Sequence, residues 1–304
     1  MLEVILQMTG LLICGVVWRL VQPAGLEYRQ TRSVLTSLVY YLLLPALVLS
    51  VLWRAELGNH SLVIALASAF GVMAGLVLTY FTCRVCRAES AQTGAIILAV
   101  AFPNVTYMGL PVLEATFGPW ARSVAIQYDL FASTPLLFTV GILIASRFGQ
   151  STDARSPLME LLRIPALWAA LAAVLLNVLA IPMPSLIKGW LQLLERGVIP
   201  LMLFSIGLSL DWQQVHLRLL PRLLPLIGLR LFVVPLLVMA LIGVIGIHGE
   251  LRAAIVMEAA MPSMVLGIVI SDRFNLDVSL YASAVTITTL LSLLTLPLWY
   301  HWLM

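Results

Sequence analysis

Long apolar runs separated by short polar connectors dominate the sequence. An apolar run of about twenty residues is long enough to cross the hydrocarbon core of a bilayer as a helix. The most polar connector, residues 147–163, separates a first half at residues 1–146 from a second half at residues 164–304, each with five predicted spans. The pattern is that of an all-α polytopic membrane protein. The ten predicted spans are Leu2–Leu20, Ser33–Trp53, Ser61–Cys83, Ala91–Phe117, Ala121–Ser146, Ile164–Ile181, Leu191–Leu210, Leu223–Ile247, Leu251–Phe274 and Val278–Leu303.

The fourth and ninth spans carry the same interruption. Both contain the pattern Ala-Ile-x-x-x-x-Ala-x-Pro, which ends at Pro103 in one span and at Pro262 in the other. A proline inside a helix removes one backbone donor and leaves the carbonyl four residues earlier without its partner. In hydrocarbon such a break is tolerated only where the freed groups face protein, water or a ligand. The residues predicted to break these two helices are Pro103, Gly109, Pro111, Pro262 and Gly267.

The number of spans in each half predicts how the halves are related. Because five is odd, a second half that repeats the first enters the membrane from the opposite side. The halves then form an inverted repeat about an axis in the membrane plane, and the two broken spans cross each other. Paired breaks of this kind are typical of the binding site of a secondary transporter.

Composition and charge agree with a membrane protein. The chain is 62% apolar and 10% charged, with a mean hydropathy of +1.05. Most basic residues fall in connectors on the same side as residues 147–163, which places this connector in the cytoplasm and both termini outside it. The expected location is a bacterial inner membrane. Arginines scattered in short loops argue against a nucleic-acid partner. Cys83 and Cys86 form a C-x-x-C at a span end without a second ligand pair, so we expect two small helix-end residues, with metal or redox chemistry as the alternative.

Ionisable residues within the spans are candidates for function, because burying a charge in a membrane is costly. Glu258 and Asp129 are the clearest cases. Asp129 and Ser133 are spaced to share a helix face, and Thr134 follows. The carboxylate of Asp129 and these hydroxyls are oxygen ligands of the type that a small cation needs, and two alternatives stay open for Asp129, which can anchor a hydrogen bond between helices or carry a proton. For Arg230 we expect that its side chain snorkels or pairs with an acid.

The backbone at the two breaks predicts two kinds of binding chemistry. Helix N-termini exposed by unwinding carry partial positive charge and suit an anion, whereas freed carbonyls at helix C-termini suit a cation. Pro103 frees the carbonyl of Ala99, and Pro262 frees that of Glu258. The alternative is a pair of kinked helices whose carbonyls are satisfied by serines or waters.

The residues around the breaks resemble a known family. Phe102-Pro103-Asn104, Gly109-Leu110-Pro111 and Ala260-Met261-Pro262-Ser263 look like the auxin efflux carrier family of PIN-like transporters, within the bile acid–auxin transporter superfamily. The resemblance implies transport of organic anions such as auxin-like or dicarboxylic acids. It also implies a scaffold of spans one, two, six and seven, through which the protein forms a homodimer, and a moving transport domain of spans three to five and eight to ten.

The same resemblance bears on the coupling ion. In sodium-coupled members of the superfamily, an acid in the ninth span joins a fourth-span Asn and fifth-span hydroxyls around Na⁺. The matching residues here are Glu258, Asn104, Ser133 and Thr134. Plant PIN proteins do not share this coupling, so Na⁺ and H⁺ both stay open.

Together these features predict a secondary transporter. The residues expected to bind substrate are Asn104, Thr106, Tyr107, Ser263 and Met264, and those expected to bind the coupling ion are Glu258, Asn104, Asp129, Ser133 and Thr134. A membrane sensor that binds the same solutes without net transport is the alternative. An enzyme is not expected, because the spans contain no metalloprotease motif or nucleophile–histidine constellation and the histidines lie at span ends.

Overall fold

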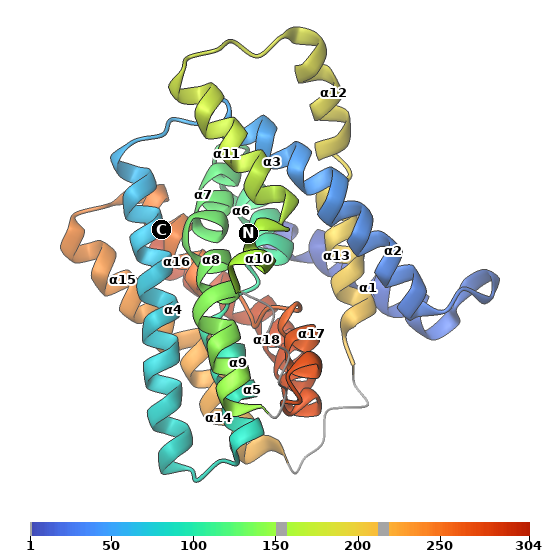
Figure 1. Ribbon diagram of the computed structural model, residues 1–304, viewed down its shortest axis with the longest axis vertical. Coiled ribbons are helices and arrows are strands. Elements are labelled where there is room, and N and C mark those ends of the chain that lie inside the picture. The colour runs from blue at the N-terminus through green and yellow to red at the C-terminus, as the bar shows by residue number, and fades with distance from the viewer. Residues whose placement is uncertain (1, 150–156, 212–218) are drawn as a thin grey trace.

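The structure is a computed structural model that describes residues 2–149, 157–211 and 219–304 (Figure 1). Within these ranges the chain is helical and contains no strand beyond one isolated backbone bridge. Residues 150–156 of the predicted connector lie outside the described ranges, and residues 157–162 of that connector form a short helix. The α-helices are α1 (Leu2–Val21), α2 (Tyr28–Leu38), α3 (Leu44–Leu52), α4 (Asn59–Val85), α5 (Ser90–Ala101), α6 (Leu110–Phe117), α7 (Ala121–Tyr128), α8 (Thr134–Leu136), α9 (Ile142–Phe148), α10 (Pro157–Leu162), α11 (Pro165–Val178), α12 (Ser185–Glu195), α13 (Val198–Ser209), α14 (Leu220–Gly228), α15 (Val234–Ile245), α16 (Gly249–Ala259), α17 (Gly267–Arg273) and α18 (Val278–Leu303).

Among the described residues, six helical segments are long and apolar enough to cross a membrane. They are Tyr28–Leu52, Asn59–Val85, Ala121–Phe148, Ser185–Ser209, Pro221–Ile245 and Val278–Leu303. Shorter apolar helices cover Leu6–Val21, Ser90–Ala101 and Pro165–Val178. The protein is therefore an integral, polytopic membrane protein, and the count of ten spans and the inverted repeat stay predictions.

Prolines shape several of the long helices without ending them. Four π-helical turns each end two residues before a proline, because proline cannot donate a backbone N–H and its ring clashes with the preceding turn. The turns and their prolines are Val39–Leu43 with Pro45, Val105–Gly109 with Pro111, Asp129–Ser133 with Pro135, and Leu229–Val233 with Pro235. Pro111 thus lies in the first turn of α6 and does not interrupt a helix, in contrast to the prediction.

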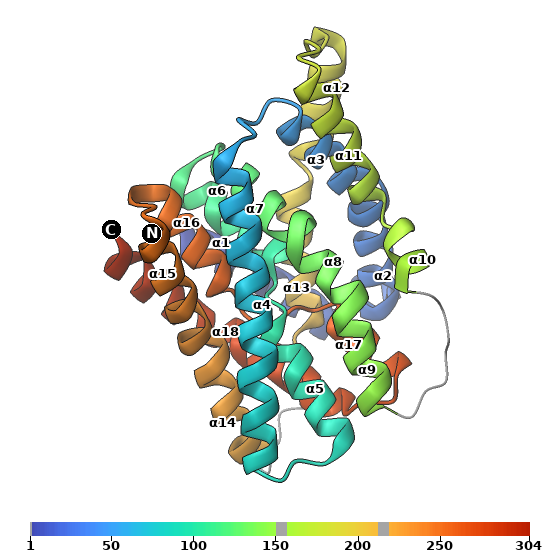
Figure 2. The same cartoon turned by 60° about the vertical axis from the view of Figure 1, so that its left-hand side comes forward.

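The helices gather into two groups. In both views α2, α3, α11 and α12 lie on one side, and α4, α14 and α15 lie on the other (Figures 1 and 2). In the first group α3 packs against α11 and α12, and α1 packs along α13. In the second group α4 packs against α5 and α15, and α18 contacts α5, α16 and α17.

The contact between α1 and α13 runs backbone to backbone. A Cβ atom added to Gly15 would lie 2.9 Å from the Cα of Gly207, and one added to Gly207 would meet the backbone of Leu12. Small residues at a crossing let membrane helices approach closely and gain van der Waals contact. Two glycines far apart in the sequence thus join the first helix of one half to a helix of the other.

Candidate functional site

The two helix breaks predicted from the sequence are present and lie directly against each other. Between α5 and α6 the chain leaves the helix at Phe102, and between α16 and α17 it does so after Ala259. The backbone N–H of Asn104 donates to the carbonyl of Pro262 at 2.8 Å, and that of Met264 donates to the carbonyl of Phe102 at 3.1 Å. The two unwound segments therefore satisfy part of each other's backbone.

The second break is also fastened to α18. The hydroxyl of Tyr281 donates to the carbonyl of Met264 at 3.0 Å, and the hydroxyl of Thr288 accepts the backbone N–H of Ser263 at 3.1 Å. Both partners lie on the buried face of α18. The long last helix thus holds the unwound segment in place.

The freed carbonyl of the first break is satisfied by a serine. The hydroxyl of Ser263 donates to the carbonyl of Ala99 at 2.7 Å, and its residue is fully buried. This is the serine contact that the sequence left open as the alternative for kinked helices. The freed carbonyl of Glu258 accepts the backbone N–H of Met261 at 3.2 Å.

Arg230 does not snorkel and pairs with no acid in the described ranges, so the expectation for it is wrong. Its side chain is only 1% exposed. One guanidinium nitrogen donates to the carbonyl of Val100 at 2.6 Å, and another donates to the carbonyl of Ala259. These carbonyls belong to the last turns of α5 and α16, so one side chain links the ends of both broken helices. The sequence could not reveal these partners, because they lie 130 and 29 residues away.

Glu258 is fully buried, and neither oxygen of its carboxyl group has a hydrogen-bond partner among the described residues. The carboxyl group lies against Gly109, where an added Cβ atom would overlap it. Gly109 has helical backbone angles, with φ −63° and ψ −50°. The prediction that Gly109 breaks the helix is therefore wrong. The lack of a side chain at Gly109 instead makes room for the acid.

Gly267 has a comparable role. It begins α17, and a Cβ atom added there would overlap the hydroxyl group of Tyr281. This glycine therefore permits the contact by which α18 holds the second break.

Asp129 anchors two hydroxyl groups. The Thr134 hydroxyl donates to one carboxylate oxygen at 2.8 Å, and the Thr106 hydroxyl donates to the other. Thr106 belongs to the π-helical turn after the first break, whereas Asp129 and Thr134 belong to the helix that starts at α7. The interhelical anchor, one of the two alternatives for Asp129, is therefore present. Ser133, predicted on the same face, is buried, and its hydroxyl has no partner among the described residues.

A cavity of about 410 Å³ lies beside the first break. Four of the residues predicted to bind substrate line it, namely Asn104, Thr106, Tyr107 and Met264, together with Asp129 and Thr134. Ser263, Glu258 and Ser133 are not among its lining residues. The structure thus brings most of the predicted substrate residues together and separates them from the buried acid.

The opposite wall of the cavity comes from α2 and α13, in which no site residue is predicted from the sequence. Helix α2 contributes Arg32, Ser33, Thr36 and Ser37, the π-helical turn that continues it contributes Tyr40, and α13 contributes Ser205 and Ser209. These α2 positions recur at helical spacing, so a polar stripe along the second span is the signal that could have found them. Arg32 is half-buried and is the one cation among the described lining residues.

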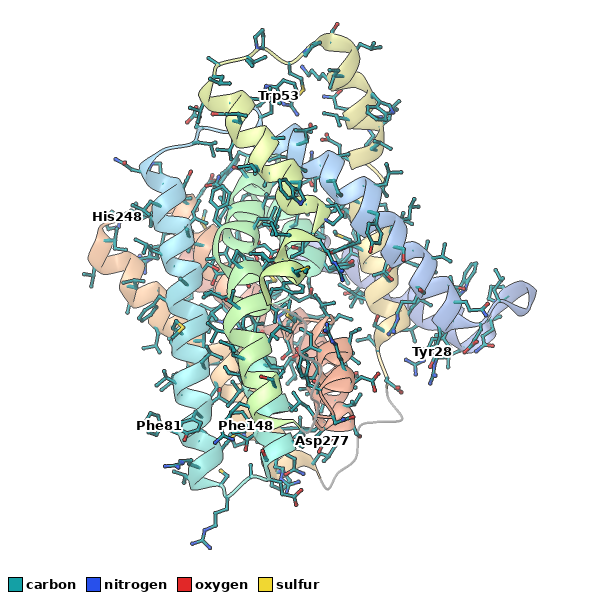
Figure 3. The ribbon with its side chains drawn as sticks, in the orientation of Figure 1. Tyr28, Trp53, Phe81, Phe148, His248 and Asp277 are labelled. Carbon is teal, nitrogen blue, oxygen red and sulfur yellow. The ribbon has the colours of Figure 1, made fainter. Side chains whose placement is uncertain are left out.

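Asp129 also lines a separate space of only about 10 Å³, together with Val48 and Leu110. Arg122 at the start of α7 donates to the carboxylate of Glu195 at 3.1 Å and forms an ion pair with Glu114. The three residues of this ion-pair cluster are not among the lining residues of the cavity. Figure 3 labels Tyr28 and Trp53, which lie at the two ends of the segment formed by α2 and α3.

The remaining candidates for metal or redox chemistry, Cys83 and Cys86, differ in their surroundings. Cys83 is buried, whereas Cys86 is exposed. Within the described ranges no group of three or more His, Cys, Asp or Glu residues is placed to hold a metal ion.

An all-helical membrane protein with two touching helix breaks beside a polar cavity belongs to the class of membrane transport proteins. Residues 5–157 and 152–300 match the family model described as membrane transport protein. The chain belongs to this family, the auxin efflux carriers.

The relatives agree with this assignment. The chain is 30% identical over 302 residues to an uncharacterized transporter of Methanothermobacter thermautotrophicus, covering 98% of this chain and 96% of the relative. It is 27% identical to an uncharacterized transporter of Methanocaldococcus jannaschii, covering 90% and 91%. It is 23% identical to the probable auxin efflux carrier component 5c of Oryza sativa subsp. japonica, covering 77% of each chain. The family and these relatives are membrane transporters and not enzymes, so the protein is a transporter.

Proposed function

We propose that the protein is a secondary active transporter of small organic anions and works by alternating access. The observation that carries the proposal is the cavity of about 410 Å³ between the first helix break and α2. Small-molecule sites of about 300–1,000 Å³ are typical, and they combine apolar walls with a few placed polar groups. Here the polar groups include Arg32 on one wall and Asn104 on the other.

Two features favour an anion. Arg32 supplies a positive charge, and the helical segment Val105–Phe117 begins at Asn104 with its N-terminus at the cavity. The first N–H groups of a helix carry partial positive charge and suit a carboxylate. The amide nitrogen of Asn104 is buried without a partner among the described residues, so it is available to a ligand. Tyr40, Phe138 and Ile206 add apolar surface for the body of an auxin-like or dicarboxylic acid.

The coupling ion in this proposal is Na⁺ or H⁺, carried at Glu258. Both of its carboxyl oxygens lack hydrogen-bond partners among the described residues. Buried polar groups are almost always paired, so an unpaired carboxyl group favours a bound ion or proton. Thr134 and Asp129, also predicted for this site, are already bonded to each other. We therefore propose that Asp129 and Thr134 hold the π-helical turn that contains Thr106 in place.

Alternating access rests on the two helix groups. The cavity is lined on one side by α2 and α13 and on the other by the residues around the first helix break, and the Arg122–Glu195 ion pair, which does not line it, joins α7 to α12. In the proposed cycle this ion pair closes one side while the Arg32 side is open. The count of basic residues assigns the Arg32 side to the cytoplasm.

Uptake by reconstituted vesicles tests the proposal. We expect vesicles to accumulate an indole carboxylate or a four-carbon dicarboxylate under a Na⁺ or pH gradient. Asn104→Ala is expected to reduce accumulation about tenfold or more, because a hydrogen bond to a charged group is lost. Glu258→Gln is expected to abolish the response to the gradient.

Asn59→Ala is the matched control, since Asn59 is exposed at the start of α4. Full accumulation by Asn104→Ala would refute the site as drawn. Vesicles that bind the anion but never accumulate it would instead support a membrane solute sensor.

A further inference from the structure

Arg230 is a buried charge of an unusual kind. It lies in the π-helical turn Leu229–Val233 between α14 and α15, and it is one of the largest fully buried side chains. The described residues include no acid that forms an ion pair with it. A buried charge without a counter-charge costs several kcal/mol unless its surroundings compensate. The compensation must therefore come from polar groups around the guanidinium.

The compensating groups are two backbone carbonyls of different broken helices. Val100 lies in the last turn of α5, and Ala259 is the last residue of α16. Carbonyls in the last turn of a helix lack intrahelical partners, and together they carry about half a negative charge. The flat guanidinium fork donates to both carbonyls at once, which a compact ammonium group could not do as well.

The turn that carries Arg230 is itself held in place. The indole N–H of Trp299 in α18 donates to the carbonyl of Leu231 at 2.9 Å, and Trp299 is buried. The π-helical turn ahead of Pro235 shifts the helical register at this position. The guanidinium is thus directed inward by its own helix and by α18.

Where helix C-termini converge, their free carbonyl oxygens carry partial negative charge and together can bind a cation. In transporters built from broken helices, such carbonyls commonly coordinate Na⁺. We propose that the Arg230 guanidinium is the resident cation of the two breaks and occupies the place that a metal ion would otherwise take between the Val100 and Ala259 carbonyls. The resident cation lies at the carbonyls of Val100 and Ala259. The carboxyl group of Glu258, which lies against Gly109, remains the position of an exchangeable ion. The relevance of the resident cation to transport rests on the proposed function, whereas the cation position itself does not.

Thermal unfolding of the purified protein tests the proposal. In Arg230→Ala the carbonyl pair is vacated, so millimolar guanidinium is expected to raise the melting temperature saturably by at least about 2 °C, as a ligand that binds the native state. Urea, which is similar in shape and uncharged, is expected to give no rise. Wild type and the exposed-residue control Arg196→Ala are expected to show no rise with either compound.

The Glu258→Gln background separates the two cation positions. In Arg230→Ala/Glu258→Gln, Na⁺ is expected to raise the melting temperature relative to a bulky organic cation, and in Glu258→Gln alone it is not. A guanidinium effect of equal size in Arg196→Ala, or no effect of any cation in the Arg230 variants, would overturn the proposal.

Two further variants decide the question if Arg230→Ala does not fold. Arg230→Lys keeps the charge and Arg230→Gln keeps N–H donors without it, so Arg230→Lys is expected to melt at the higher temperature. The reverse order would show that hydrogen bonding and not charge is required. These melting measurements stand even if wild-type vesicles accumulate no anion, an outcome that would refute the transport proposal alone.

Discussion

At the scale of single residues, the interior is organised around close contacts that only small side chains allow. The carboxyl group of Glu258 lies against the backbone of Gly109, within the first broken segment. A charged or titratable group in a membrane interior is costly and must have a specific place. Gly109 supplies that place by having no side chain.

Replacing Gly109 tests this contact. Gly109→Ala is expected to destabilise the protein by about 1–3 kcal/mol, because its Cβ atom must displace the carboxyl group of Glu258. Chemical or thermal unfolding in detergent measures the change, and uptake is expected to fall with it.

A double variant distinguishes this overlap from a general helix effect. Gly109→Ala combined with Glu258→Ala is expected to be less destabilised than the sum of the single variants, because the truncated acid makes room. Gly10→Ala is the control, since a Cβ atom at Gly10 meets nothing within 4 Å. Strict additivity would contradict the role assigned to Gly109.

At the scale of elements, the two unwound segments are stabilised by each other and by α18, in place of the helical hydrogen bonds that the prolines remove. Ser263 donates to the Ala99 carbonyl, and Asn104 donates to the Pro262 carbonyl. Backbone groups within a membrane must be satisfied by protein, and here one broken helix satisfies the other.

Removing one proline tests whether the break serves function. Pro103→Ala restores an N–H donor that can bond to the Ala99 carbonyl in competition with Ser263. We expect α5 to extend, the Asn104 turn to shift and uptake to be lost, while the melting temperature stays near that of wild type. Pro297→Ala is the matched control, because Pro297 lies inside α18 away from the cavity. Wild-type uptake by Pro103→Ala would show that the break itself is not needed.

At the scale of the whole molecule, an ion-pair cluster outside the cavity joins helices that are far apart in the sequence. Arg122 of α7 pairs with Glu114 of α6 and with Glu195 of α12, and so joins α6 and α7 to α12. Glu195 is 8% exposed, and a partly buried pair of this kind is screened less than a surface pair. In the proposed cycle the cluster must open when the cavity changes sides.

Weakening this cluster is expected to shift the equilibrium between the two states. Glu195→Gln removes one carboxylate charge while Glu114 stays paired with Arg122. A cysteine at Ser209, which lines the cavity, is then expected to react several-fold more slowly with a maleimide in a background free of the native cysteines. Glu56→Gln, at an exposed position, serves as the control. An unchanged labelling rate would argue against a gating role for the Arg122–Glu195 pair.

The sequence alone determined the membrane class, the family and the positions of both helix breaks. These are local properties, because the length of an apolar run and the missing N–H of a proline act within one segment. It also pointed to four residues that line the cavity, Asn104, Thr106, Tyr107 and Met264, because polar or adaptable side chains next to a break stand out in an apolar span. Their role in binding substrate stays a prediction.

Only the tertiary structure decided which groups satisfy the broken helices. Ser263 lies next to a break as predicted, yet its hydroxyl donates to the carbonyl of Ala99 and its side chain does not line the cavity. Arg230 reaches carbonyls of α5 and α16 from a different helix, and α2 completes the cavity from the opposite side. Hydrogen-bond partners and cavity walls depend on how distant segments pack, and no local pattern encodes that packing.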